Sequence, residues 1–231
     1  SECHIQTPST AFTTFQNQIP STSFTTIQNG HQIANSLDPN NPQKLLKNNT
    51  IDVNVIIVGQ DPYPQPGVAT EIAFGTVSKD SPLPPSLQVI QTELAVNYYN
   101  DITYNIADPT LQSWQDQGVF LTNCSLTLTE YTPEGEPNLY MQNSHSYLWR
   151  VVLMEKLFTE LSDIGNLIFV FMGTKARYYE KFIDLDKNNV VLTTIHPVAD
   201  YRNGSQLFIG SKIFNKINDE LTKKHKNVIE W

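Results

Sequence analysis

Four polar side chains stand directly after apolar runs in this sequence, and their types suit acid–base and hydrogen-bond chemistry. They are the carboxylate of Asp61, the amide of Asn123, the hydroxyl of Thr174 and the imidazole of His196. A carboxylate can stabilise a positive charge, and a neutral imidazole can donate a hydrogen bond to an oxygen that gains negative charge. Each has a simpler explanation when taken singly, because an Asp after a strand often only caps a turn and a His before Pro is often structural. Together they predict one cleft, provided that the fold brings them to the same place.

The segments that must position these side chains alternate between strand and helix patterns. Buried strands are predicted for the apolar runs at residues 53–58, 118–124, 167–172 and 190–195. Helices are predicted at residues 85–98, 144–161, 175–183 and 210–224. This alternation predicts an α/β fold of three layers, with helices on both faces of a central four-stranded, mostly parallel sheet. Ligands bind such sheets at the carboxyl ends of the strands, which is where the four side chains stand.

Several short motifs resemble those of the family 1 uracil-DNA glycosylases, with some features of the poxviral branch. Residues 59–63 read Gly-Gln-Asp-Pro-Tyr, the signature of that family, and His196-Pro197 with Tyr201-Arg202 resembles its C-terminal His-Pro loop. The other matching segments follow in the family's order: Phe74, 82–86, 121–123, 143–145 and 229–231. The resemblance covers about residues 50–231.

The resemblance implies that the chain hydrolyses the N-glycosidic bond of deoxyuridine in DNA and releases free uracil, as in base excision repair. Asp61 would stay ionised, stabilise the cationic sugar and orient the attacking water. His196 would be neutral and donate a hydrogen bond to uracil O2. This reaction needs neither a metal nor a cofactor. The alternative is a non-catalytic module on the same fold, which would bind uracil or DNA or assist replication.

The resemblance also implies a set of uracil-binding residues. The amide of Asn123 can match uracil O4 and N3–H together, a pattern that cytosine inverts. Phe74 would stack on the flipped base, and Tyr63 would exclude the methyl group of thymine. Gln60 would contribute mainly a backbone contact, with its side chain incidental.

DNA-binding residues are expected around the same cleft. They are Pro82, Pro84, Pro85, Ser86, Gly173, Thr174, Val198, Tyr201 and Arg202. The His-Pro loop is shorter than is usual in the family, with Ala199-Asp200 near the position of the residue that is inserted into the duplex. Either Val198, Tyr201 or Arg202 substitutes for that residue, or the chain prefers single strands. Pro64, where most members have His, is a second departure.

The charge balance at first counts against a nucleic-acid partner. The formal net charge is −8, from 15 Lys and Arg against 23 Asp and Glu. Residues 80–149 hold eight of the acids and no Lys or Arg, so the rest of the chain is neutral. Bases are gathered toward the C-terminus, at Arg202, Lys212, Lys216, Lys223, Lys224 and Lys226. This distribution predicts a DNA-binding face near the C-terminal segment, with weak, salt-sensitive affinity.

Two parts are predicted along the chain: an arm at residues 1–50 and a catalytic domain at 51–231. The arm is rich in Ser, Thr, Gln and Asn, and residues 9–17 recur at 21–29, a 12-residue tandem repeat. It is interpreted either as a weakly ordered arm or as a docking segment.

The expected partners follow from the resemblance: uracil-containing DNA, single- or double-stranded, with a replication factor or a DNA-mimic inhibitor protein as further candidates. No apolar run is long enough to cross a membrane, and two cysteines favour a reduced, intracellular setting, cytoplasmic or nuclear. A monomer is expected.

Overall fold

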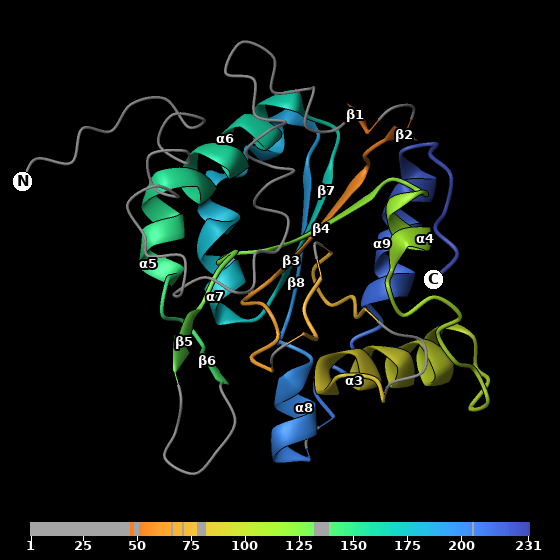
Figure 1. The fold of residues 1–231 in the computed structure, drawn as a ribbon. Coiled ribbons are helices and arrows are strands. Elements are labelled where there is room, and N and C mark those ends of the chain that lie inside the picture. Colours follow the sequence, from red (N-terminus) through yellow and green to blue (C-terminus); the bar gives the residue numbers. More distant parts are fainter. Residues whose placement is uncertain are drawn as a thin grey trace, which may run out of the picture.

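The centre of the molecule is a four-stranded sheet in which every strand is parallel to its neighbours, in the order β4-β3-β7-β8 (Figure 1). The computed structural model describes residues 47–48, 51–65, 67–70, 72–77, 82–131, 139–204 and 206–231. The four strands are β3 (Val55–Gly59), β4 (Val119–Asn123), β7 (Ile168–Met172) and β8 (Val190–Thr194). They overlap the four predicted runs, so the predicted α/β fold and its sheet are confirmed.

The two central strands are apolar at every position because both faces of the sheet are covered. Side chains along a strand point alternately to opposite faces. Ile57 and Val170 accordingly belong to one buried cluster, whereas Ile56 and Phe171 belong to another. The sheet is therefore the middle layer of three, as the alternation of strands and helices predicts.

Helices cover each face of this sheet (Figure 1). The first face carries α3 (Pro85–Glu93), η3 (Leu94–Tyr98), α4 (Gln112–Gln115) and α9 (Ile213–Lys223). The second face carries α5 (Ser146–Trp149), η4 (Arg150–Met154), α6 (Glu155–Ile164), α7 (Thr174–Arg177) and η5 (Tyr178–Phe182). A short 3-10 turn, η6 (Leu185–Lys187), leads into β8. The predicted helices are thus present, although three of them are divided into shorter segments.

The segment after His196 is a helix rather than the loop that the motif suggests. Pro197 takes a helical φ of −53°, and α8 (Val198–Asn203) follows it. Gly204 then ends the helix with a left-handed φ of 60°, a conformation that glycine adopts without a steric penalty. Proline before the helix and glycine after it therefore delimit α8.

Two small antiparallel pairs complete the described structure: β1 (Lys47–Asn48) with β2 (Ile51–Asp52), and β5 (Thr129–Tyr131) with β6 (Leu139–Met141). The β5–β6 pair and α8 both lie at the carboxyl end of the sheet (Figure 1). The predicted repeat arm lies outside the described residues except for 47–48. In the part that is described, no helix is long and apolar enough to cross a bilayer.

Candidate active site

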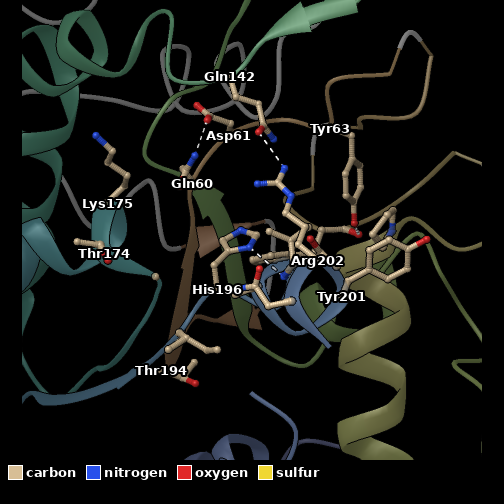
Figure 2. A pocket seen from close by; sticks show the side chains of 18 of the residues that line it. Gln60, Asp61, Tyr63, Gln142, Thr174, Lys175, Thr194, His196, Tyr201 and Arg202 are labelled. Carbon is tan, nitrogen blue, oxygen red and sulfur yellow. Dashed lines mark hydrogen bonds between the residues drawn. The ribbon is translucent and has the colours of Figure 1, made fainter. Parts of the chain in front are cut away.

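A pocket of about 1090 Å³ opens where β3, β7 and β8 end (Figure 2). Because parallel strands end at the same edge of the sheet, Asp61, Thr174 and His196 reach it from three different strands. The predicted site residues that line it are Gln60, Asp61, Tyr63, Phe74, Pro85, Ser86, Gly173, Thr174, His196, Val198, Tyr201 and Arg202. Asn123, Pro82 and Pro84 do not line it.

Asp61 has one oxygen held by hydrogen bonds and one oxygen without a partner. Its Oδ2 accepts hydrogen bonds from Gln60 Nε2 at 2.9 Å and from the backbone N–H of Asn143 at 3.0 Å. Its Oδ1 is buried and has no hydrogen-bond partner among the described residues. Burial raises the pKa of this carboxyl above its usual value, while the two hydrogen bonds and the nearby Lys175 lower it. The carboxylate is oriented through Oδ2, and Oδ1 keeps its capacity to accept a hydrogen bond.

The Gln60 side chain therefore has a structural role that the sequence analysis did not assign to it. Its amide donates to Asp61, so it sets the orientation of the carboxylate rather than being incidental. Adjacent residues on a strand point in opposite directions, but this pair lies beyond the end of β3, where the backbone turns.

His196 is held as a neutral hydrogen-bond donor. The backbone N–H of Val198 donates to its Nδ1 at 3.2 Å, so Nδ1 is unprotonated and Nε2 carries the hydrogen. Burial, with the positive charge of Arg202 nearby, lowers the pKa of the imidazole to about 4. The ring is therefore uncharged near neutral pH, in the tautomer that can donate from Nε2.

Gly173 allows β7 and the His196 loop to come together. A Cβ at this position would lie 2.9 Å from the Cβ of His196, and the backbone has a φ of +94°. Both facts require glycine here. The predicted Gly173–Thr174 turn therefore positions the imidazole as well as beginning α7.

Phe74, Tyr63 and Asn123 meet around Gly59. A Cβ on Gly59 would lie 2.4 Å from Asn123 Oδ1 and 2.8 Å from Phe74 Cζ. The Tyr63 hydroxyl donates to the carbonyl of Phe74 at 2.6 Å, which holds a residue whose φ is 67°. The Phe74 and His196 rings lie with centroids 5.8 Å apart. The predicted base-recognition side chains are thus brought together, with Asn123 beneath the pocket surface at 2% exposure.

The predicted DNA-binding residues divide into those at the pocket and those outside it. Pro85 and Ser86 begin α3 and line the pocket, whereas Pro84 is buried and Pro82 is exposed away from it. The segment around α8 also differs from the expectation at one position. Asp200, near the expected site of insertion, is only 5% exposed, so it cannot enter a duplex.

Asp200 instead organises the chain that follows α8. Its carboxylate accepts hydrogen bonds from the backbone N–H groups of Leu207, Phe208 and Ile209, at 2.8 to 3.0 Å. Tyr201, the neighbouring residue, is 55% exposed and lines the pocket. Of the residues suggested for insertion, Tyr201 and Arg202 are exposed, and Val198 is half-buried.

Sequence reasoning missed part of the support for Asp61. The backbone N–H of Asn143 carries no residue-specific signal, although the segment 143–145 matched a family motif. His145 supports this turn, because its Nδ1 and Nε2 each lie 2.9 Å from a threonine hydroxyl, those of Thr127 and Thr129. Gln142 accepts a hydrogen bond from Arg202 at 3.2 Å across the pocket.

The charges of the C-terminal segment are not all near the pocket. Lys224 Nζ donates to the carbonyl of Asn188, and Lys226 Nζ donates to the carbonyl of Asn166 at 2.9 Å and to Asn54 Oδ1 at 2.6 Å. These partners precede β8, β7 and β3, so both lysines lie at the amino ends of the strands, opposite the pocket. The predicted DNA-binding face is therefore wrong for these two lysines.

The described acids from the middle of the chain do not line the pocket. Among the described residues that line it, Asp61 is the single carboxylate, and none of the acids of residues 80–149 contributes. Across all the residues that the structure describes, no three His, Cys, Asp or Glu side chains are grouped closely enough to hold a metal ion.

Comparison with known proteins agrees with this geometry. The Uracil DNA glycosylase superfamily profile matches residues 47–222. The uracil-DNA glycosylase of Azobacteroides pseudotrichonymphae is 34% identical over 180 residues, which cover 78% of this chain and 74% of that protein. The uracil-DNA glycosylase of Leuconostoc citreum is 36% identical over 180 residues, covering 77% and 73%. Among solved structures, mimivirus uracil-DNA glycosylase matches with a TM-score of 0.64 and 26% identity, over 78% of this chain and 67% of that chain.

These matches confirm the resemblance drawn from the motifs. They support the catalytic function, hydrolysis of an N-glycosyl bond in DNA, rather than the non-catalytic alternative. The chain belongs to the uracil-DNA glycosylase superfamily.

Proposed function

We propose that this chain, as a uracil-DNA glycosylase, releases uracil from DNA through complementary electrostatic roles of Asp61 and His196. The observation that carries the proposal is their pairing in one pocket. Asp61 has one oxygen that bonds to no other described residue, and the His196 imidazole is held as a neutral donor. Cleavage of an N-glycosidic bond passes through a cationic sugar while negative charge moves to the departing base. The carboxylate of Asp61 suits the cationic sugar, and the neutral donor of His196 suits the negative charge on the departing base.

In this mechanism, the bond between sugar C1′ and uracil N1 breaks, and its electron pair leaves with the base. Asp61 stabilises the positive sugar and orients a water through Oδ1. His196 donates a hydrogen bond from Nε2 to uracil O2, where negative charge accumulates. The water oxygen then bonds to C1′, and its proton is lost to the surrounding solvent.

The recognition roles follow from the positions of Asn123 and Phe74 beside Gly59, and of Tyr63 bonded to Phe74. Asn123 presents the amide that distinguishes uracil from cytosine, and Phe74 stacks on the base. Tyr63 is buried, and its hydroxyl is held by Phe74, so its ring is rigid enough to reject a larger base by steric contact.

The main test is uracil release from uracil-containing oligonucleotides, both single- and double-stranded. Asp61→Asn is expected to lower the rate by orders of magnitude, because the neutral amide cannot stabilise the cationic sugar. The matched control is Asp219→Asn, which removes an exposed carboxylate on α9. Well-folded protein that binds these oligonucleotides without releasing uracil would contradict the proposal.

DNA is the partner that family membership implies, and further partners are proposals. One similar solved structure, at 25% identity and a TM-score of 0.62, is a mimivirus UNG variant in complex with UGI. By analogy, a DNA-mimic inhibitor protein is proposed to bind the mouth of the pocket. Binding to a replication factor, the monomeric state and an intracellular location, cytoplasmic or nuclear, stay predictions.

A further inference from the structure

A group of aromatic rings and cations lies on the second face of the sheet, beside the pocket rather than in it. The guanidinium carbon of Arg150 is 4.7 Å from the centroid of the Tyr147 ring and 5.2 Å from that of the Tyr178 ring. Lys181 Nζ is 3.8 Å from the Tyr178 centroid. These four residues, Tyr147, Arg150, Tyr178 and Lys181, are here called the aromatic–cation cluster. Neither the motifs nor the proposed mechanism gives them a role.

The aromatic–cation cluster adjoins the rim of the pocket. Gln142 and Arg177 line the pocket. Tyr147 lies five residues after Gln142, at the start of α5, and Tyr178 directly follows Arg177. Figure 1 shows α5 and α7 as neighbours on the same face of the sheet. A DNA strand that leaves the pocket on this side can therefore pass over the cluster.

The charge of this surface is opposite to that of the whole molecule, which carries a formal −8. The segments α5, η4, α7 and η5 together hold four cations and one acid: Arg150, Lys175, Arg177, Lys181 and Glu180. Among the described residues that line the pocket itself, three cations, Lys175, Arg177 and Arg202, stand against the single carboxylate of Asp61. A polyanion is therefore attracted to the pocket and to the cluster beside it.

Tyr147 is the exposed ring of the cluster, with 69% of its surface open to solvent. Arg150 lies over one face of this ring, so the opposite face is open to a ligand. The cation–π contact also favours one orientation of the ring. Tyr178 is held more firmly, because it is partly buried and its hydroxyl donates to Glu155 Oε1 at 2.8 Å. The cluster thus presents one oriented ring, Tyr147, on a cationic surface.

An exposed aromatic ring among cations suits an unpaired nucleotide. The base stacks on the ring, and the phosphates lie near the positive charges, as in proteins that bind single strands without sequence preference. A duplex fits this arrangement less well, because its bases are already stacked on one another. The chemistry of the cluster therefore favours a single strand.

We propose that the face of Tyr147 turned away from Arg150 stacks on an unpaired base of the DNA strand that runs from the pocket over α5. Arg150 and Lys181 lie near the phosphates of the same strand. This inference rests on the proposed function and deepens it, because it makes a single strand with an extended flank the substrate that the protein binds best. The stacked base belongs to the flank, whereas the deoxyuridine occupies the pocket.

The experiment combines variants of Tyr147 with substrates that lack one base. The substrate is a single-stranded oligonucleotide that contains one deoxyuridine. A tetrahydrofuran spacer replaces one flanking nucleotide at a time, on either side, so that a base is lost while every phosphate stays. Uracil release is measured for the unaltered protein, Tyr147→Ala and Tyr147→Phe. The control is Leu185→Ala, which removes another exposed apolar side chain, in η6 and outside the pocket lining.

On the unmodified single strand, Tyr147→Ala is expected to raise KM about five- to tenfold, the lower part of the range for one base stacked on an aromatic ring. Its kcat should stay unchanged, because Tyr147 does not line the pocket. Tyr147→Phe keeps the ring and should match the unaltered protein, as should Leu185→Ala. At one flanking position, the spacer should raise KM of the unaltered protein by the same factor and that of Tyr147→Ala no further. On a duplex, Tyr147→Ala should match the unaltered protein.

Three results overturn the proposal. One is an unchanged KM of Tyr147→Ala on the single strand. Another is a rise in KM of Tyr147→Ala that is equally large at every spacer position, because the ring would then support the fold rather than contact a base. The third is an equal rise on the duplex. Failure of the proposed function is a separate result, in which the unaltered protein releases no uracil from the unmodified strand.

Discussion

Replacing Gly59 by alanine is the most direct test of how Asn123 and Phe74 are positioned for base recognition. The added Cβ would lie 2.4 Å from Asn123 Oδ1 and 2.8 Å from Phe74 Cζ, both closer than real Cβ contacts, which do not fall below 3.0 Å. Gly59 and Asn123 are paired in adjacent strands, so the backbone cannot separate them without disturbing the β3–β4 ladder. The strain must therefore move the two side chains that the proposed function assigns to uracil.

The size of the effect follows from these distances. Asn123 Oδ1 must retreat from 2.4 to at least 3.0 Å, and Phe74 must also shift. A misplacement of about 1 Å in an active site can cost about 100-fold in rate, so we expect kcat/KM for uracil release to fall about 10- to 100-fold. Overpacking in a closely packed region costs about 1–3 kcal/mol of unfolding free energy.

The assay compares uracil release and thermal unfolding in Gly59→Ala and in a control that is destabilised elsewhere. Gly165→Ala is suitable, because its Cβ would lie 2.7 Å from the carbonyl of Lys187 and the backbone φ is +76°. Gly165 follows α6, and it does not line the pocket. Both variants should lose stability, by about 2–4 °C in Tm for each kcal/mol, and only Gly59→Ala should lose activity. A Gly59→Ala protein with activity within threefold of the unaltered chain would refute the idea that Gly59 positions Asn123 and Phe74 for uracil.

Three further predictions concern single side chains. The unfolding free energy should fall by up to about 3 kcal/mol from pH 7 to pH 4, because the unfolded chain protonates His196 near pH 6.5 and the folded chain only near pH 4. The raised pKa of Asp61 has the opposite effect on the unfolding free energy, because that carboxyl favours the folded state as the pH falls. The measurement is therefore chemical denaturation of the unaltered chain and of His196→Gln at each pH. The variant should lack the contribution of the imidazole. Tyr63→Phe should cost about 1–3 kcal/mol in the same measurement, since the Phe74 carbonyl loses its donor, and an unchanged midpoint would argue against that role. Tyr201→Ala should slow uracil release from duplexes more than from single strands, and equal losses on both would exclude Tyr201 as the inserted residue.

Local patterns were sufficient to predict the sheet and the position of the site. The strands are apolar at nearly every position because both faces are buried, and such runs are visible without any knowledge of tertiary contacts. Parallel strands joined by helices must end at one edge, which places Asp61 and His196 together although 135 residues separate them. The short motifs supplied the chemistry, because residue types such as Asp and His are themselves the signal.

What the sequence alone determined was therefore which residue types stand at the strand ends and which reaction they suit. Only the tertiary structure decided how those groups are held and charged. The orientation of the Asp61 carboxylate and the neutral tautomer of His196 depend on hydrogen-bond partners and burial that the fold supplies. One of those partners, Asn143, acts through its backbone N–H, a donor that every residue except proline possesses. The same holds for charge: composition set the net value of −8, and only the fold turned three cations toward the pocket and Lys226 away from it.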